Sequence, residues 1–472
     1  MSILSAEVSK ADLPVIKSFM DNREYKTANQ LLGAYLVENP SDEDALFLYG
    51  RMMNECDNPA IAVLCYAHNT TKEGKDSWQN WLNLGHSYDQ LSNATQAELC
   101  YKRALELKPN NEQIMTSLGT CYVQQYRSQE AVDMLESVLE RYPEAGKARS
   151  SLGFAYLQLR EFGKGWDHYE AGYGKLQWRT ERKYVDEGLW TGAKKKSQHV
   201  IVHGEQGLGD QIAGAEILND MAEDVSIVAV EVEEKLSNLF ARSFPNLDIR
   251  DTLKETGIEW PHAKTIDSHC GFFTGHKWYR RKASDYSGKP YLVADPERRL
   301  MWRSLFDSWG KRPTIGIAWS GGVAVTHRGT RRADLNAWLP ILGMDCDFVS
   351  LEYKNRREDI DALQRRRKVK IHEFPFATAS EDYDDTAALV AELDFVVCVP
   401  TSVVHLAGAL GVQTLCMVHE TPNIHYGCTG VDMPYYGSVE LFRRKDNEWP
   451  KAVSAVAKTL KDRINAPRLR RA

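Results

Sequence analysis

The chain has 472 residues, 59 Lys and Arg against 65 Asp and Glu, a net charge of -6 and 43% hydrophobic residues. This length leaves room for about three domains, and the composition excludes a disordered or collagen-like polymer. The acidic balance argues against a general nucleic-acid coat. The first thirty residues lack the apolar stretch of a signal peptide, and no run of about 18 apolar residues predicts membrane insertion. Nine cysteines without a CxxC pair suit reduced thiols, so we expect a cytoplasmic location.

A 34-residue period runs through the first third of the chain. A leucine-glycine pair recurs at this spacing, at Leu84-Gly85, Leu118-Gly119 and Leu152-Gly153. Tyr49-Gly50 repeats the pattern with a one-residue slip. Small residues where helices touch are typical of stacked helical pairs. Residues 11–172 thus resemble the tetratricopeptide family, which implies a groove for a protein or peptide; a spacer or dimerisation element is the alternative.

Charge divides at the end of these repeats. Residues 1–175 hold 17 Lys and Arg against 24 Asp and Glu, a net charge of -7, which leaves +1 for the rest of the chain. The acidity therefore belongs to the repeats. We predict a repeat array at 1–175, a junction at 176–193, two Rossmann-like domains at 194–305 and 306–446, and a crossing helix with a basic tail at 447–472.

From residue 199 onward, short apolar runs alternate with amphipathic segments. Strands are predicted at 199–203, 226–231, 247–250, 265–266, 314–319, 348–351, 369–373, 395–399 and 413–418. Helices are predicted at 211–221, 233–242, 358–366, 384–392, 401–410 and 450–464. Near-continuous apolar strands predict parallel sheets that are covered on both faces. Two Rossmann-like units therefore follow each other, and we expect a ligand at the carboxyl ends of their strands.

A glycine-rich turn, Gly-Glu-Gln-Gly-Leu-Gly-Asp at 204–210, follows the first predicted strand. Gly207 and Gly209 allow a tight turn that exposes N–H groups at a helix start, where anionic oxygens are favoured. Asp210 is then a candidate general base that takes a proton from an acceptor hydroxyl. The alternative is an ordinary first-turn acid that stabilises the helix.

Candidate groups for a diphosphate follow two strands of the second unit. Thr401 or Ser402 caps a predicted helix, and His405 lies one turn further on. The loop 326–332 follows a Ser-Gly-Gly turn and offers arginines, among them Arg328 and Arg331, that suit phosphate or carboxylate. A structural histidine and a solvated charged loop are the alternatives. Together with the glycine-rich turn, these groups predict a nucleotide diphosphate held between two domains.

Four stretches in the right order carry a wider resemblance, at 204–212, 315–321, 385–389 and 405–411. Together they resemble bacterial tetratricopeptide proteins fused to a heptosyltransferase-like glycosyltransferase domain of the ADP-heptose:LPS heptosyltransferase superfamily. The resemblance covers nearly the whole chain. It implies a tetratricopeptide α-solenoid followed by an α/β glycosyltransferase of the GT-B type with two Rossmann domains.

The resemblance also implies a reaction, the inverting transfer of a sugar from a nucleotide-diphosphate sugar to a hydroxyl of a protein, peptide or surface-glycan acceptor. No metal and no cofactor beyond the donor substrate are implied. The turn acid of the family falls on Asp210, as catalytic base or acceptor-orienting group. The nucleotide-sugar-binding residues that we predict are Gln206, Gly207, Gly209, Ser320, Gly321, Arg328, Arg331, Glu352, Thr401, Ser402 and His405.

The chain also departs from the family pattern. Pro400 replaces an aspartate, Ile424-His425-Tyr426 replaces a Trp-Arg-Trp-like stretch, and Gly321-Gly322 replaces a Gly-Asn turn. One alternative is therefore a non-catalytic scaffold with a relic nucleotide pocket. Another is glycosylation of hydroxymethylated DNA bases, although a nucleic-acid partner is not favoured because basic runs are usually solvated. An NAD-dependent oxidoreductase is disfavoured by the glycine spacing, and a homo-oligomer stays open.

Overall fold

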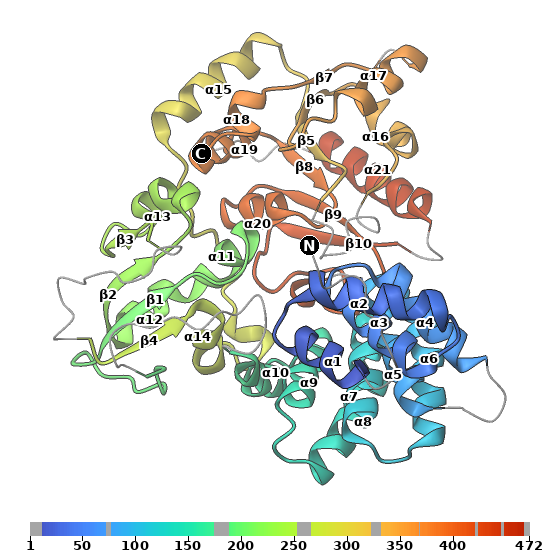
Figure 1. Cartoon of the computed structure of the whole chain (residues 1–472). Helices are drawn as coiled ribbons and strands as arrows, with labels where there is room; N and C mark the ends of the chain where they lie inside the picture. The colour runs from blue at the N-terminus through green and yellow to red at the C-terminus, as the bar shows by residue number, and fades with distance from the viewer. Residues whose placement is uncertain are drawn as a thin grey trace. The chain divides into compact units, whose positions relative to one another are not determined.

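The computed structural model describes residues 12–71, 77–173, 188–252, 266–321, 332–367, 369–420, 423–444 and 448–466. The chain divides into two compact units (Figure 1). We call Met1–Ala155 the repeat region and Tyr156–Ala472 the α/β region. The five domain segments predicted from the sequence stay predictions.

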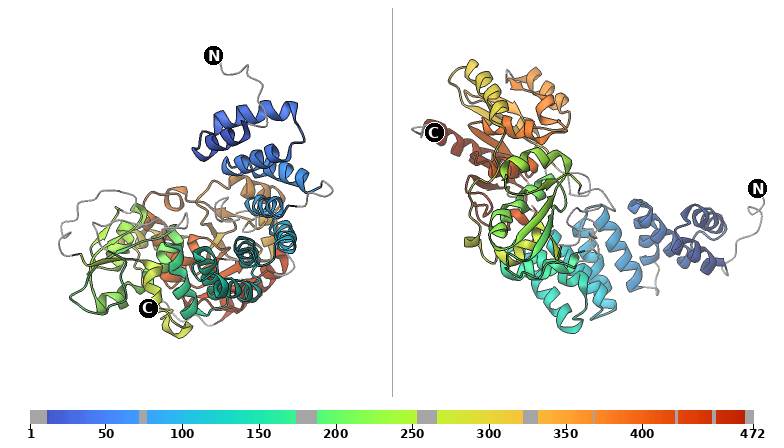
Figure 2. Two further views of the ribbon diagram at one scale, coloured as in Figure 1. Left: turned by 60° about the horizontal axis from the view of Figure 1, so that its bottom comes forward. Right: turned by 90° about the vertical axis from the view of Figure 1, so that its left-hand side faces the viewer.

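Antiparallel helices that pack in successive pairs make up the repeat region (Figure 2). They are α1 (Leu13–Asp21), α2 (Tyr25–Glu38), α3 (Glu43–Glu55), α4 (Pro59–Thr70), α5 (Trp78–Gln90), α6 (Ala94–Leu107), α7 (Glu112–Gln124), α8 (Ser128–Arg141) and α9 (Gly146–Gln158). Helix α9 crosses into the α/β region, which begins at Tyr156. The helical stack predicted from the 34-residue period is confirmed.

The backbone carries the same period. One residue in the left-handed conformation follows the first helix of each pair, with φ between 57° and 63°, at Arg23, Asp57, Ser92, Tyr126 and Arg160. The spacing is one residue longer between Asp57 and Ser92 than elsewhere, which is the slip expected at Tyr49-Gly50. The left-handed turn reverses the chain between paired helices, so the repeat is defined by its turns as well as by its packing.

Close packing explains the glycines of the repeat. A Cβ added to Gly85 would lie 2.4 Å from the ring of Tyr101, which is fully buried on the paired helix α6. Gly50 faces Tyr66 in the same way, and Gly119 faces Leu135. A small residue on one helix thus admits a large one from its partner.

The first sheet of the α/β region is parallel, with strand order β3-β2-β1-β4. Its strands are β1 (His199–His203), β2 (Ser226–Glu231), β3 (Ile249–Arg250) and β4 (Ser268–Gly271). The helices that accompany it are α10 (Phe162–Tyr169), α11 (Leu208–Gly214), α12 (Leu218–Asp224), α13 (Ser237–Ser243) and α14 (Phe272–Tyr279). Helix α15 (Pro296–Ser308) comes next in the chain and packs against the helix Tyr383–Ala391 of the second sheet.

The second sheet is also parallel, with strand order β10-β9-β8-β5-β6-β7. Its strands are β5 (Thr314–Ala318), β6 (Asp347–Ser350), β7 (Ile371–His372), β8 (Phe395–Cys398), β9 (Thr414–Val418) and β10 (Val439–Arg443). Its helices are α16 (Leu339–Leu342), α17 (Arg357–Arg366), α18 (Pro375–Thr378), α19 (Tyr383–Ala391), α20 (Ser402–Ala409) and α21 (Trp449–Asn465). The helical stack followed by two parallel sheets is the α plus two-Rossmann arrangement, of GT-B type, predicted from the sequence.

Three local differences have physical causes. The predicted helix 211–221 is broken by a 3₁₀ turn into α11 and α12. Strand β4 lies at Ser268–Gly271, and the predicted strand at 265–266 falls partly outside the described residues. Residues 268–271 were missed because Cys270 stands between small and polar residues that give a weak apolar signal. Strand β10 was not predicted, since Glu440 and Arg443 break the apolar run of an edge strand.

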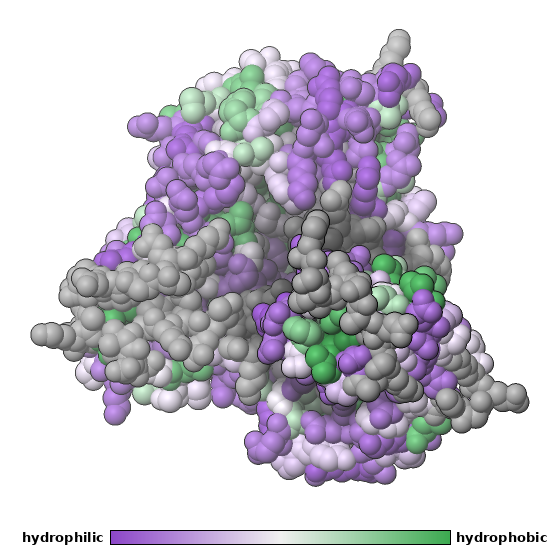
Figure 3. All heavy atoms as spheres, in the orientation of Figure 1, coloured by the Kyte–Doolittle hydropathy of each residue, from purple (hydrophilic) through white to green (hydrophobic). Residues whose placement is uncertain are grey.

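Among the described residues, no helix is long and apolar enough to cross a membrane. The face drawn in Figure 3 is mainly hydrophilic, with dispersed hydrophobic side chains. Exposed large hydrophobic residues, such as Leu64, Leu99 and Phe376, come from different elements.

Two glycine substitutions are expected to change stability in opposite directions. Gly85→Ala places a Cβ against Tyr101, so we expect it to lower the free energy of unfolding by about 1–3 kcal/mol. Gly33, in the exposed surface of α2, has no atom within 4 Å of an added Cβ, so Gly33→Ala is expected to raise stability by about 1 kcal/mol. Urea unfolding of both variants measures this, and equal effects would contradict the packing explanation.

Candidate functional site

Strand order reverses once in each sheet, and most predicted site residues follow the strands at these reversals. In the second sheet the reversal lies between β8 and β5, and in the first sheet β1 lies between β2 and β4. Ser320 and Gly321 follow β5, Thr401 follows β8, and the glycine-rich turn follows β1. Loops that diverge at such a reversal leave room for a ligand at the carboxyl ends of the strands.

The glycine-rich turn is held by α10. Gln206 adopts a left-handed conformation, with φ 60°, and its Nε2 donates to the hydroxyl of Tyr169 over 2.9 Å. Its carbonyl oxygen accepts a 3.3 Å hydrogen bond from Nε2 of Gln211. Gly207 then begins α11 as its N-cap. The side chain at 206 therefore fixes the turn to the end of α10.

Asp210, in the first turn of α11, pairs with His425 across the α/β region. Nε2 of His425 lies 3.0 Å from Oδ1 of Asp210, and the Gly207 N–H lies 3.4 Å from Oδ2. Burial raises the pKa of Asp210, but the hydrogen bond and charge of His425, with the charge of His405, outweigh burial and hold it below its usual value. Asp210 is therefore ionised at neutral pH, and 21% of its side-chain surface is exposed.

The imidazole of His425 is enclosed by other rings. Phe273 of α14, Tyr435 and His405 of α20 have ring centroids 5.4, 5.3 and 5.2 Å from it. Nδ1 of His425 is buried and has no hydrogen-bond partner among the described residues. The hydrogen bond to Asp210 thus fixes the direction in which the ring points.

Gly209 brings α11 against α20. A Cβ at Gly209 would lie 3.1 Å from Cδ2 of His405 and 3.2 Å from Cα of Ser402. On α20, Thr401 accepts the Val403 N–H over 3.1 Å as N-cap, and Tyr383 donates to Oγ of Ser402 over 3.0 Å. The predicted residues Gly209, Asp210, Ser402 and His405 are therefore neighbours.

His405 is also held by the segment before β10. Its Nδ1 lies 3.2 Å from the hydroxyl of Tyr436, and it is 4% exposed. Its ring contacts with His425 and Tyr436 make it a buried member of the cluster that surrounds Asp210.

Ser320 and Glu352 form a second polar group after β5 and β6. Glu352 accepts hydrogen bonds from the N–H groups of Trp319 and Ser320, at 2.8 and 2.7 Å, and from Oγ of Ser320 at 2.5 Å. Burial raises the pKa of Glu352 despite these bonds. Arg356 Nε donates to Oγ of Ser320 over 3.1 Å and lies 3.8 Å from Glu352. Ser320 therefore uses its N–H and hydroxyl within the protein.

The turns after β5 and β8 are in contact. A Cβ at Gly321 would lie 2.4 Å from Cγ2 of Thr401 and 2.8 Å from the carbonyl oxygen of Pro400. Only a residue without a side chain fits between them. The strand order thus brings Gly321 and Thr401 together.

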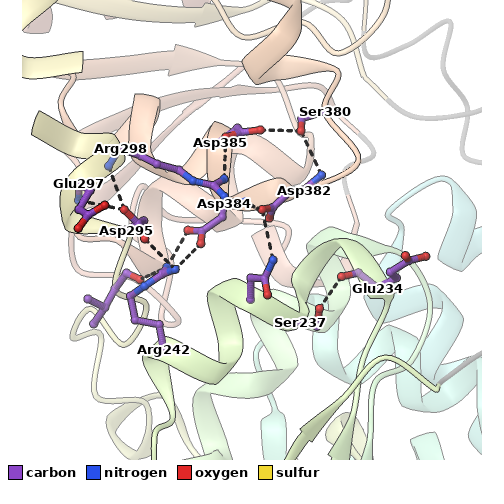
Figure 4. Close-up of polar contacts among 12 residues, drawn as sticks. Glu234, Ser237, Arg242, Asp295, Glu297, Arg298, Ser380, Asp382, Asp384 and Asp385 are labelled. Carbon is purple, nitrogen blue, oxygen red and sulfur yellow. Dashed lines mark hydrogen bonds and ion pairs between the residues drawn. The ribbon is translucent and has the colours of Figure 1, made fainter. Parts of the chain in front are cut away.

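Arginine-aspartate pairs gather where α13 of the first sheet meets α19 of the second sheet, away from Asp210 (Figure 4). Arg242 of α13 binds both carboxylate oxygens of Asp384 on α19, at 2.8 and 2.5 Å, and one of Asp295, at 3.2 Å. Arg298 of α15 bonds Asp382 and Asp385. Because Asp384 is fully buried, loss of Arg242 would leave an unpaired charge and disfavour this contact between the sheets.

The repeat region has a groove of its own, with a volume of about 530 Å³. Polar side chains line most of it, among them Asn54, Asn83, His86 and Asp89. Burial raises the pKa of Asp89 to about 6 and lowers that of His86 to about 4. At neutral pH the groove therefore carries a neutral imidazole and a largely ionised carboxylate, whose Oδ1 has no partner among the described residues.

Two predicted residues, Arg328 and Arg331, lie outside the described residues. The partnership of Asp210 with His425 was not predicted, because 215 positions separate them and only the fold brings them together. Arg356 was also missed, although its position four residues after Glu352 was an available signal. Among the described residues, no three His, Cys, Asp or Glu side chains are placed to hold a metal ion.

The fold and these residues define a tetratricopeptide-repeat protein whose α/β region has two parallel Rossmann-like sheets. The Tetratricopeptide repeat family matches residues 79–111, the α5–α6 pair. An alignment of 471 positions with Protein FlbA of Caulobacter vibrioides shows 23% identity and covers 88% of this chain and 77% of FlbA. The chain is thus a distant homologue of FlbA.

Solved structures are similar to part of the chain. The MamA protein is 18% identical with a TM-score of 0.31, and the match covers 36% of this chain and 96% of MamA. YrrB, described as a TPR protein with an unusual peptide-binding site, is 18% identical with a TM-score of 0.31, over 35% of this chain and 86% of YrrB.

Removal of the His425 imidazole is expected to raise the pKa of Asp210. In His425→Ala, burial acts on the carboxylate without the hydrogen bond that opposes it. The Asp210 carboxyl carbon, observed by NMR after selective labelling, should then titrate at higher pH than in the wild type. His199→Ala is the matched control, because His199 faces Asp267 at 3.5 Å where both side chains are 43% exposed. An unchanged Asp210 titration in His425→Ala would contradict this account.

Proposed function

We propose that this protein is a glycosyltransferase that transfers a sugar from a nucleotide-diphosphate sugar to a hydroxyl of a macromolecule, with inversion and without a metal. One observation carries the proposal: an ionised carboxylate at the start of α11 lies beside the capped start of α20. A base for the acceptor and a site for a leaving anion are then adjacent.

In this reaction the acceptor oxygen forms a bond to the anomeric carbon as the bond from that carbon to the diphosphate oxygen breaks. The hydroxyl proton passes to Oδ2 of Asp210, which otherwise has only the long contact with the Gly207 N–H, and the nucleoside diphosphate leaves with the bonding electrons. Since the pKa of Asp210 is held low, it is a weak base for a neutral hydroxyl. Proton transfer is therefore coupled to departure of the diphosphate, when the hydroxyl becomes acidic.

The leaving diphosphate requires positive charge and N–H donors. The start of α20 after Thr401 supplies the positive end of a helix dipole, and Arg356 is a cation beside Ser320. Arg328 and Arg331 are proposed as further cations. Ser320, Gly321 and Glu352 form the adjoining turn for the nucleotide side, with Ser402 and His405 on α20.

We assign the binding of the sugar and the acceptor to the glycine-rich turn that follows β1. Gly207 and Gly209 keep the turn free of side chains next to Asp210, and Gln206 holds it to Tyr169. A Cβ at 209 would lie 3.1 Å from His405 and 3.2 Å from Ser402, so a side chain there would push the two helix starts apart by a few tenths of an ångström. The acceptor hydroxyl would reach the exposed part of Asp210.

The repeat groove is proposed to select the acceptor. Asp89 suits a basic side chain of a peptide. The amides of Asn54 and Asn83 line the groove beside it, although they also bond Ser87 and the Gln79 carbonyl. A protein or peptide acceptor therefore fits the groove better than a nucleic acid, whose phosphates would face the acidic repeats.

Asp210→Asn is expected to lower kcat of sugar transfer by about 10²–10⁴-fold with little change in donor affinity, because the amide cannot accept the proton. The donor is found first by calorimetry with UDP-, GDP-, ADP-, CMP- and dTDP-sugars, and transfer is then measured with and without EDTA. Asp267→Asn is the matched control, since Asp267 is an exposed acid of the same region. A metal requirement would be exposed by loss of transfer in EDTA.

The competing function is a scaffold with a relic nucleotide pocket. Pro400 in place of an acid, and the use of Ser320 within the protein, favour it. If the wild type binds none of the five donors, or if Asp210→Asn transfers sugar at the rate of the wild type, the glycosyltransferase is wrong and the scaffold stands.

A further inference from the structure

The segment between β9 and β10, which carries His425, is built around the guanidinium of Arg443. From the last position of β10, Arg443 donates to the carbonyl oxygens of four loop residues. These are Tyr426 at 2.6 Å, Gly427 at 3.0 Å, Thr429 at 2.8 Å and Gly430 at 2.8 Å. The loop backbone next to His425 is thus turned toward its own strand.

Arg160 binds the same loop from the turn between α9 and α10. Its Nη1 donates to both carboxylate oxygens of Asp432, at 2.9 and 2.8 Å, and its Nη2 donates to the Asp432 carbonyl at 2.6 Å. The N–H of Cys428 donates to the carbonyl oxygen of Gln158 over 2.9 Å. A Cβ at Gly427 would lie 2.8 Å from Nε of Arg160, so the guanidinium lies against the backbone two residues after His425.

Arg160 occupies the left-handed turn position that follows the first helix of each helical pair. Its counterpart in the first pair is Arg23, with φ 62° against 63° at Arg160. Arg23 is exposed, whereas the side chain of Arg160 is only 20% exposed. The two arginines therefore share residue type and backbone conformation, and the contact with the loop distinguishes them.

Residues 158–169, which include Arg160, also contact the turn that precedes Asp210. Tyr169, at the end of α10, accepts from Gln206 in the glycine-rich turn that precedes Asp210. Trp166 stacks on Phe273 at 5.7 Å, and Phe273 in turn contacts the ring of His425. Residues 158–169 thus contact both the turn that carries the carboxylate and the loop that carries the imidazole.

We propose that Arg160 is a positioning residue that fixes His425 against Asp210 through the loop 424–432. The expected effect of Arg160 on sugar transfer rests on the proposed function. The His425 ring has one hydrogen bond among the described residues, to Asp210, so its place depends on the loop backbone and on neighbouring rings. An arginine whose Nη1 contacts both carboxylate oxygens of Asp432, and whose Nη2 binds the Asp432 carbonyl, sets that loop in both position and orientation.

The test compares Arg160→Asn with Arg23→Asn in the full chain. Asparagine tolerates the left-handed turn but is too short to reach Asp432, so the backbone change is the same in both variants. We expect Arg160→Asn to shift the NMR signals and titration of the His425 ring, assigned with His425→Gln. We also expect kcat/KM to fall by about tenfold and the acid limb of its pH profile to move to higher pH. Arg23→Asn should change neither.

The pH profile also depends on the other titratable groups that face Asp210 and His425. The titratable groups that face Asp210 and His425 are His405 from α20 and Tyr435 from the segment before β10. Neither is bonded to Arg160 or Asp432 among the described contacts. A moved acid limb therefore reports the pairing of Asp210 with His425.

A second variant separates folding from positioning. Asp432→Asn removes the charge of a side chain that is 65% exposed, and it should shift the His425 signals in the same direction by a smaller amount. The double variant Arg160→Asp with Asp432→Arg should restore part of the wild-type spectrum. Unchanged His425 signals in Arg160→Asn would overturn the positioning role even if transfer is lost. Shifted signals with no transfer in the wild type would leave the positioning role standing and overturn the glycosyltransferase.

Discussion

The site depends on the absence of a side chain at Gly209. At that position α11 and α20 approach until a Cβ would touch Ser402 and His405. Because Asp210 is the next residue, this approach places its carboxylate close to the start of α20. Arg242 with Asp384 joins helices of the same two sheets elsewhere, so the approach at Gly209 is one of several contacts between them.

The surroundings of Asp210 and of Glu352 shift the pKa values of these two carboxyl groups in opposite directions. Asp210 is partnered by imidazoles, and its pKa is lowered, whereas burial dominates at Glu352, and its pKa is raised although three donors bind it. Environments that separate the pKa values of two acids assign them different chemistry. In the proposed reaction Asp210 takes the proton as the hydroxyl becomes acidic, whereas Glu352 organises the turn at Ser320 through its hydrogen bonds.

The sequence predicts features that repeat or that lie close together along the chain. The 34-residue period, the parallel strands and the place of Asp210 at a helix start follow from local spacing, and the structure has most of these elements, with the exceptions at 211–221, β4 and β10. His425 and Arg160 are different, because each meets its partner across more than 200 residues and neither has a distinctive neighbourhood in the sequence. Contacts between residues so far apart in the sequence depend on the topology of the fold, which the spacing of residues along the chain does not reveal.

The left-handed turns of the repeat have a consequence for how such proteins diversify. Residues that face the paired helix, such as Gly85, must allow close packing. The turn residue is required only to tolerate a positive φ. Its occupants are accordingly diverse, an arginine, an aspartate, a serine, a tyrosine and again an arginine. A solenoid thus carries, once per repeat, an adaptable position at which a new bond to a neighbouring domain arises by one substitution without disturbing the stack.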